Sequence, residues 1–356
     1  MFRNKTNKGE VLMKRKLLSV LLAGVMCTGL MACGGSSSDA AASAEETEAT
    51  EDDASASAEI TLKLAHADNE TSIFHQGSLA FKEKLEELSG GTMTVEIYPN
   101  GQLGSLADAA QGIQMGTIDV APISSTVLAN FSPSIGVYDL PFIIENEQQA
   151  YDSLDGEVGE ALTAELESNS MLCKGWWTMG YRNVTTSKET TSIDDLKGQK
   201  IRTQNSEIQM AIFTALGADP TPMDFSELFT ALQQKTVDGQ ENPYVNILQS
   251  NIFEVNDTIV ETEHVYQVAG LLVSPKTYEG LTDAQKRWVD EAGAYSTTVE
   301  REACTADNEK AKETLVNNHG MKVVELDKQE LQKRTEGVYD DYPDLKDLAD
   351  KVKSYK

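Results

Sequence analysis

The chain of 356 residues contains few of the groups from which catalytic and metal sites are built. Its 4 histidines share no metal-ligand spacing, and it has only 4 cysteines. It lacks the G-x-S-x-G, H-E-x-x-H, P-loop, C-x-x-C and G-x-G-x-x-G motifs. Carboxylates are so abundant that pairs of them arise by chance, and no general acid–base pair stands out. We therefore predict a protein that is not an enzyme and that holds neither a cofactor nor a metal.

Positive charge is also scarce. The chain has 30 Lys and Arg against 57 Asp and Glu, for a formal net charge of -27. Nucleic acid is excluded as a partner, because its binding depends on neutralising phosphates with Lys and Arg. An anionic ligand would require a local basic site inside an acidic protein. With 40% hydrophobic residues, the chain is long enough for two domains, each with its own core.

Long apolar runs are few, and the one that stands out lies near the N-terminus. A basic segment at 13–16 precedes "LLSVLLAGVMCTGLMA", which is too short for a comfortable membrane span. The run ends in Leu30-Met31-Ala32-Cys33, which resembles a bacterial lipobox, so we predict a signal peptide over 1–32 and lipidation at Cys33. The alternative is a plain secretory signal with an incidental cysteine. We expect translation to start at Met13.

The next segment, 33–58, has almost no residue that can enter a core. From Ser36 onward it contains no aromatic and no branched aliphatic side chain, and it is rich in acids. Such a composition predicts a disordered acidic tether. Together with the lipidation site, it indicates a protein anchored to the outer face of the cell membrane, or one in a periplasm. Cys173 and Cys304 are expected to be separate thiols, with a disulfide between them as the alternative.

From Ile60 onward, segments with strand periodicity alternate with segments of helical periodicity. This alternation predicts an α/β fold with a largely parallel sheet. A helix with Leu79, Phe81, Leu85 and Leu88 on its buried side should end at the glycines of "SGG". We predict further strands in "MTVEIYP", at the end of "SLADAAQGIQMGTIDVAPIS", in "GVYDLPFII", in "GWWTMGYRNVTTSK" and in "VYQVAGLLVSP".

The second half has its own alternation. A strand at 200–203 precedes the helix of "SEIQMAIFTALGA", and Asp224 with Glu227 predicts a capping-box-like start for the next helix. A long helix should run from "TDAQKRW" to "NNHG" with an interruption at Gly293. The chain should end with the strand "MKVVEL" and one charged amphipathic helix.

Several blocks together resemble one family. "GGTMTVEIYPNGQLGS", "GIQMGTIDVAPIS", "YDLPFII", "GYRNVTTSK", "DLKGQKIRTQNS" and "PTPMDFSELFTALQQKTVDGQENP" occur in the order and spacing of the substrate-binding proteins of TRAP transporters, the DctP family. Asp224 departs from the pattern, since a proline is usual there.

The resemblance implies a two-domain fold like that of periplasmic binding proteins, with a hinge, a ligand cleft between the domains and a long helix that spans both. It also implies a solute-binding protein that delivers a small organic acid to a membrane permease, and we expect a monomer. The predicted division is a domain I of 59–179 plus 268–307 and a domain II of 180–267 plus 308–356.

The resemblance also implies site residues. Arg202 matches the arginine that forms a salt bridge with the ligand carboxylate, Arg182 a second arginine of the same site, and Asn242 an asparagine on the opposite side. The remaining predicted contacts are Ser124, Phe225, His66, Asp68 and Trp177.

The residues themselves leave simpler alternatives open. Arg202 ends a strand, where α/β proteins bind ligands, but it can also pair with a local acid. Arg182 can pack over an aromatic face, and Asn242 before Pro243 suits an ordinary turn. Trp177 is of a type that is more often found in a core. The segment 66–70 can instead start a helix, with Asn69 or Thr71 as its cap.

An acid such as Asp68 in the cleft would accept hydrogen bonds from hydroxyl groups and would repel a second carboxylate. We therefore predict a sugar acid, such as a uronate or an aldonate, as the ligand. The alternatives are a C4-dicarboxylate or other carboxylate, or a role as the ligand sensor of a membrane receptor.

Overall fold

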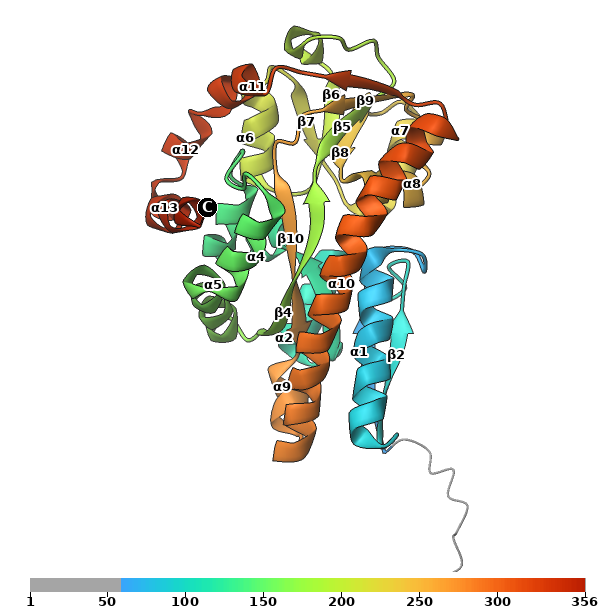
Figure 1. Cartoon of the computed structure of the whole chain (residues 1–356), viewed down its shortest axis with the longest axis vertical. Coiled ribbons are helices and arrows are strands. Elements are labelled where there is room, and N and C mark those ends of the chain that lie inside the picture. Colours follow the sequence, from blue (N-terminus) through green and yellow to red (C-terminus); the bar gives the residue numbers. More distant parts are fainter. Residues whose placement is uncertain (1–58, 356) are drawn as a thin grey trace, which may run out of the picture. The chain divides into compact units, whose positions relative to one another are not determined.

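The structure is a computed structural model that describes residues 59–355 (Figure 1). The predicted signal peptide (1–32), the lipidation site Cys33 and the predicted tether (33–58) all lie outside these residues. Within 59–355, no helix is both long and apolar enough to cross a membrane. The expected α/β class is confirmed, with two separate sheets of five and six strands.

The first sheet has the strand order β2-β1-β3-β10-β4. β1 pairs in parallel with β2 and β3, whereas β10 runs antiparallel to both β3 and β4. Its strands are β1 (Ile60–Ala65), β2 (Met93–Tyr98), β3 (Val120–Ser124), β4 (Leu172–Tyr181) and β10 (Tyr266–Val273).

The second sheet has the order β11-β9-β5-β8-β6-β7. Here β5 runs antiparallel to β8 and β9, and the other pairings are parallel. Its strands are β5 (Asn183–Thr186), β6 (Lys200–Thr203), β7 (Asp219–Pro222), β8 (Gly239–Asn242), β9 (Thr258–Glu261) and β11 (Lys322–Glu325). Both sheets are therefore mixed rather than largely parallel, because the chain returns from one sheet to the other and inserts antiparallel strands.

Helices and short 3-10 turns surround the sheets. The helices that precede the second sheet are α1 (Ile73–Ser89), α2 (Leu106–Met115), α3 (Ser125–Leu128), α4 (Glu147–Asp155) and α5 (Glu157–Ser168). Those that follow are α6 (Glu207–Ala215), α7 (Phe225–Gln233), α8 (Tyr244–Gln249), α9 (Pro275–Glu279), α10 (Asp283–Asn317), α11 (Lys328–Thr335), α12 (Val338–Asp341) and α13 (Lys346–Ser354). The 3-10 turns are η1 (Pro133–Asp139), η2 (Ile193–Leu196), η3 (Ile252–Glu254) and η4 (Pro343–Leu345).

The chain passes between the two sheets three times. β4 continues through Arg182 into β5, β9 returns through 262–265 into β10, and α10 runs from the end of β10 to β11. α10 packs on α1 and β4 and also on α8, so the expected long spanning helix is present (Figure 1). The last helix, α13, packs back on α4, α5 and η1. The division into domains I and II, with 308–356 in domain II, stays a prediction.

Several local expectations fail where tertiary contacts decide. "GVYDLPFII" forms η1 and a turn instead of a strand, and "GWWTMGYRNVTTSK" forms two strands, β4 and β5, in different sheets. The C-terminal segment forms three helices instead of one. Leu79, expected on the buried side of α1, is 39% exposed. The start of α1 is capped by Ser72, whose Oγ accepts from His75 N, and not by Asn69 or Thr71.

Two predicted helix boundaries also change. Asp224 is the N-cap of α7, but its side chain makes no capping hydrogen bond. Gly293 does not interrupt α10, which runs unbroken from Asp283 to Asn317. A Cβ at Gly293 would lie 2.6 Å from the carbonyl oxygen of Lys174. The glycine therefore allows α10 to approach β4 closely, which is a packing role that periodicity cannot reveal.

A buried acid lies in this contact between α10 and β4. Glu300 is 0% exposed, and its Oε2 accepts a hydrogen bond from the backbone N of Thr178 at 3.0 Å. Its Oε1 has no hydrogen-bond partner among the described residues. Burial raises the pKa of Glu300 to about 8, and the Thr178 N–H and Arg301 oppose the shift.

We predict that Glu300 makes stability fall as the pH rises. Its pKa in the folded protein lies above the ordinary 4.5, so the folded state binds more protons than the unfolded state between about pH 4.5 and 8. Glu300→Gln should remove this decline. Between pH 5 and pH 9, the free energy of unfolding of the variant should therefore rise by about 3 to 5 kcal/mol relative to that of the parent. Urea unfolding at both pH values measures this difference. Glu302→Gln, an exposed neighbour on α10, is the control. Equal pH profiles for the parent and Glu300→Gln would contradict the prediction.

Candidate functional site

A small cavity lies where the exits of strands from both sheets meet. Its volume is about 30 Å³, enough for about two water molecules. Most of the predicted site residues line it, namely Arg202, Arg182, Asn242, Phe225, Ser124 and Asp68. The other lining residues are Ala67, Phe74, Leu106, Met179, Gln204 and Asn246. We call this space the inner cavity.

Arg202 supplies a buried cation at the wall of the inner cavity. It is 1% exposed, and its Nε and Nη2 donate to the carbonyl oxygen of Met223 at 3.1 and 2.8 Å. Its Nη1 is buried and has no hydrogen-bond partner in the described part of the chain. Burial lowers the pKa of Arg202 to about 10, so the guanidinium stays charged at neutral pH. A buried donor without a partner is costly, which makes this atom a place for an anion.

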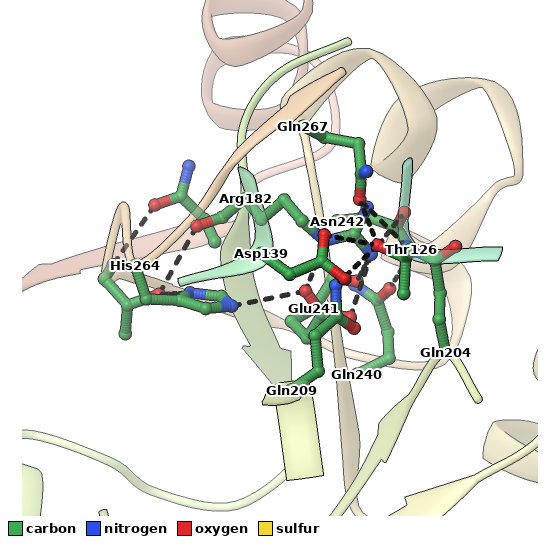
Figure 2. A network of polar contacts seen from close by, with 12 residues as sticks. Thr126, Asp139, Arg182, Gln204, Gln209, Gln240, Glu241, Asn242, His264 and Gln267 are labelled. Carbon is green, nitrogen blue, oxygen red and sulfur yellow. Dashed lines mark hydrogen bonds and ion pairs between the residues drawn. The ribbon is translucent and has the colours of Figure 1, made fainter. Parts of the chain in front are cut away.

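Arg182, by contrast, already has an anionic partner. Its guanidinium forms an ion pair with Glu241, and both side chains are buried (Figure 2). Nη1 donates to Gln267 Oε1 at 3.0 Å, and Nη2 donates to Asn242 Oδ1 at 3.1 Å. His264 Nε2 lies 3.3 Å from Glu241 Oε2. Burial alone would raise the pKa of Glu241, but Arg182 and His264 lower it to about 2. The charge of Arg182 is therefore already neutralised by Glu241 within the protein.

Asn242 lies in β8, directly before Pro243, and its amide is held on both sides. The oxygen accepts from Arg182, and the nitrogen donates to Gln240 Oε1 (Figure 2). Pro243 restricts the backbone of Asn242 to an extended conformation. The amide is therefore rigidly placed at the cavity wall.

The opposite wall comes from the first sheet. Ser124 ends β3, and its Oγ donates to Gln204 Oε1 at 3.0 Å. Asp68 follows β1, is half-buried, and accepts from Asn246 Nδ2 through Oδ1 at 3.1 Å. Burial raises the pKa of Asp68 to about 6. The inner cavity is therefore lined by both an acid, Asp68, and a cation, Arg202.

Phe225 and Gln204 complete the surroundings of Arg202. The ring centroid of Phe225 lies 5.8 Å from the guanidinium carbon, a cation–π contact, and Phe225 lines the cavity as an apolar residue. Gln204 Nε2 donates to Gln267 Oε1, which also accepts from Arg182 and Thr126 (Figure 2). Gln267 thereby connects residues of both sheets.

Two predicted site residues do not line the inner cavity. Trp177 is 0% exposed and packs on Phe74 in the core under α1, where a Cβ on Gly77 would touch its ring at 2.7 Å. His66 is buried in contact with His75, with 3.0 Å between Nε2 and Nδ1. Burial, followed by the charge of His75, lowers the pKa of His66 to about 4. Both side chains lie against α1 and not on the wall of the inner cavity, and their role in ligand binding stays a prediction.

Three further polar residues at the site, Gln204, Asn246 and Gln267, were not predicted from the sequence. Gln204 follows Arg202 by two residues, and residues at this spacing along an extended segment share a face, so strand periodicity was a usable signal. Asn246 and Gln267 gave no comparable signal, because they reach the site through contacts with residues far away in sequence.

A larger groove continues outward from the inner cavity. Its volume is about 530 Å³, and it shares Ala67, Leu106, Arg202, Gln204 and Phe225 with the inner cavity. The rest of its wall comes from the segments 100–111 and 127–131, from Asn205 and from 223–226. We call it the outer groove.

Other polar features carry no comparable site. A surface hollow of about 840 Å³ lies along α10 and includes Arg301, which donates to both carboxylate oxygens of Asp155 at 2.8 Å. Its other cation, Lys174, pairs with Asp290 at 2.7 Å, so both charges are already neutralised. Within the described residues, no group of three His, Cys, Asp or Glu is placed to hold a metal ion. Cys173 and Cys304 are both free thiols.

Comparison with known proteins agrees with this geometry. Residues 64–346 match the family of bacterial extracellular solute-binding proteins, family 7 (DctP). The chain therefore belongs to this family, which confirms the resemblance seen in the sequence.

Three relatives have named ligands. The 2,3-diketo-L-gulonate-binding periplasmic protein YiaO of Escherichia coli is 32% identical over 66% of this chain and 73% of its own length. The C4-dicarboxylate-binding periplasmic protein DctP of Rhodobacter capsulatus is 30% identical over 71% of this chain and 76% of its own. The crystal structure of a sugar acid binding protein of Advenella mimigardefordensis in complex with galactonate is 30% identical, with a TM-score of 0.81, over 83% of this chain and 98% of that one.

Proposed function

We propose that this chain is the solute-binding subunit of a TRAP transporter and that it captures a hydroxylated monocarboxylate, a sugar acid such as an aldonate or uronate. The chain would deliver this acid to the membrane permease without changing it. The observation that carries the proposal is the buried, charged guanidinium of Arg202, which lines the inner cavity and whose Nη1 has no hydrogen-bond partner among residues 59–355. The galactonate complex and the diketogulonate-binding relative support the substrate class.

The proposed roles follow from the contacts. Arg202 would bind the carboxylate through the fork of its guanidinium. Asn242, oriented by Arg182, would bind the same carboxylate from the other side, and Ser124 and Asp68 would bind hydroxyl groups. Phe225 would pack on the apolar face of the ligand. Arg182 would act mainly on Asn242, because its charge is neutralised by Glu241.

A thermal-shift screen of sugar acids and dicarboxylates tests the proposal. A ligand at about a hundred times its Kd adds about 2.7 kcal/mol of stability, which is easily detected. We expect aldonates or uronates to raise the melting temperature most. A screen in which only neutral sugars or amines raise it would overturn the proposal.

The C4-dicarboxylate-binding relative makes a dicarboxylate the second candidate. The charges of the inner cavity argue against it, because Arg202 is the cation without a partner among the described lining residues and Asp68 would repel a second carboxylate. D-Gluconate and D-glucarate are a matched pair, since they differ only in the oxidation of the terminal carbon.

We predict that Asp68→Asn improves the affinity for glucarate relative to gluconate by at least about tenfold at pH 7.5, since it removes the opposing charge. The pKa of Asp68 is raised to about 6, so lowering the pH from 7.5 to 5 should protonate it and relax the discrimination in the parent protein. The variant should show no such pH effect. Isothermal titration of both acids at both pH values measures this. An unchanged ratio in the variant would exclude Asp68 as the discriminating group.

A further inference from the structure

The inner cavity is too small for the acid that the proposed function assigns to it. A volume of about 30 Å³ holds about two water molecules and not a six-carbon acid. The adjoining outer groove has about 530 Å³, which is within the usual size of a ligand site. Because Arg202, Gln204 and Phe225 line both spaces, an acid whose carboxylate is bound by Arg202 would extend from there into the outer groove.

The outer groove is present although hydrogen bonds already connect the segments on the first sheet's side of the site with those on the second sheet's side. Asn69 Nδ2 donates to the carbonyl oxygen of Gln249 at 2.8 Å, and Asn130 Nδ2 donates to that of Asn205 at 3.1 Å. Ser124 reaches Gln204 as described above. These bonds join the segments after β1 and after α3 to α8 and to the segment after β6. The groove is therefore a space that remains when these contacts are formed.

The chemistry of the groove wall suits a second sugar. Amides and hydroxyls such as those of Asn100, Gln111 and Ser226 both donate and accept hydrogen bonds. Asp224 also lines the groove, is exposed and makes no capping bond, so its carboxylate is available to hydroxyl groups. Phe131 adds a ring on which the apolar face of a sugar can pack.

We propose that a single aldonate held by Arg202 occupies the inner end of the outer groove, beside Gln204 and Phe225, and that the outer end of the groove is a second ligand subsite. This second subsite takes the polar tail of a longer acid, such as a sugar acid that carries a second sugar unit. The inference rests on the proposed function, because Arg202 must hold the carboxylate at the inner end. The tail then lies along the start of α7, past Asp224 and Ser226.

Isothermal titration with D-gluconate and lactobionate tests the subsite, because lactobionate is gluconate that carries one galactose. Ser226→Trp should fill the groove, while Thr230→Trp, one turn further along α7 and exposed but outside both cavities, is the matched control. We expect the parent to bind lactobionate at least as tightly as gluconate. Ser226→Trp should weaken lactobionate at least about tenfold and gluconate less than about threefold. Thr230→Trp should change neither affinity.

The outcomes separate the two proposals. If gluconate binds but lactobionate does not, or if Ser226→Trp weakens both acids equally, the second subsite is refuted and the proposed function stands. If neither acid binds to the parent and the thermal-shift screen finds no other sugar acid, the proposed function fails, and the subsite fails with it. Folding of each variant is checked by its melting temperature without ligand.

Discussion

Arg202→Ala is expected to weaken binding of the best sugar acid in the screen by about 2 to 5 kcal/mol, which is about 30-fold to 4,000-fold in Kd. Arg202 is 1% exposed, and its Nη1 has no hydrogen-bond partner within 59–355, so its charge is available to a ligand carboxylate in a largely buried place. Isothermal titration at pH 7.5 measures the loss.

Two further variants sharpen this test. Arg202→Lys should recover only part of the affinity, because an ammonium lacks the planar fork that matches a carboxylate. Arg334→Ala removes an arginine that pairs with Asp194 and Glu330 on the surface, and it should leave the affinity unchanged. An affinity of Arg202→Ala equal to that of the parent would remove the basis of the proposed function.

Glu241→Ala is expected to destabilise the fold by about 3 to 5 kcal/mol, because it leaves Arg182 buried without its anionic partner. Both side chains are nearly inaccessible to solvent, at 0% and 1% exposure. The melting temperature and urea unfolding at pH 7.5 measure the loss. The double variant Arg182→Met and Glu241→Leu should recover part of it, since apolar residues can replace a buried pair.

The pH dependence of this contribution has a definite sign. The folded pKa of Glu241 is lowered to about 2 from an ordinary 4.5, so its contribution is fully present above about pH 4.5 and is lost as the pH falls toward 2. Glu241→Ala should lack this acid-dependent loss. Glu87→Ala removes an exposed partner of Lys84 on α1 and is the control, with little expected change. A loss for Glu241→Ala no larger than that of Glu87→Ala would show that the buried pair contributes nothing special.

The sequence predicted much of the local structure correctly because the relevant signals are local. Alternating Ile60, Leu62 and Leu64 form β1, and α1 ends at Gly90 in the left-handed conformation. Arg202 lies in β6, one residue before the strand ends, and lines the inner cavity, which agrees with the predicted position near a strand end.

Errors occurred where a contact distant in sequence decides the outcome. Gly293 was predicted to interrupt a helix, but α10 is continuous there, and the glycine lets the helix lie close to the backbone of Lys174. Asp224 looks like a cap, yet its side chain makes no capping bond. That Trp177 packs under α1 could likewise not be seen in the sequence, because which face of β4 a helix covers depends on contacts with distant segments.

The chain's own residues determined the α/β class, the acidic surface, and the presence of an arginine and an asparagine at strand ends, since composition and periodicity act over a few neighbours. Only the tertiary structure decided that Arg182 is neutralised by Glu241, while Arg202 has an N–H without a partner among the residues described. It also decided that Gln204, Asn246 and Gln267 lie beside them. The physical reason is that the environment of a buried charge depends on which distant segments exclude water from it. Such neighbours come together only when both sheets have formed.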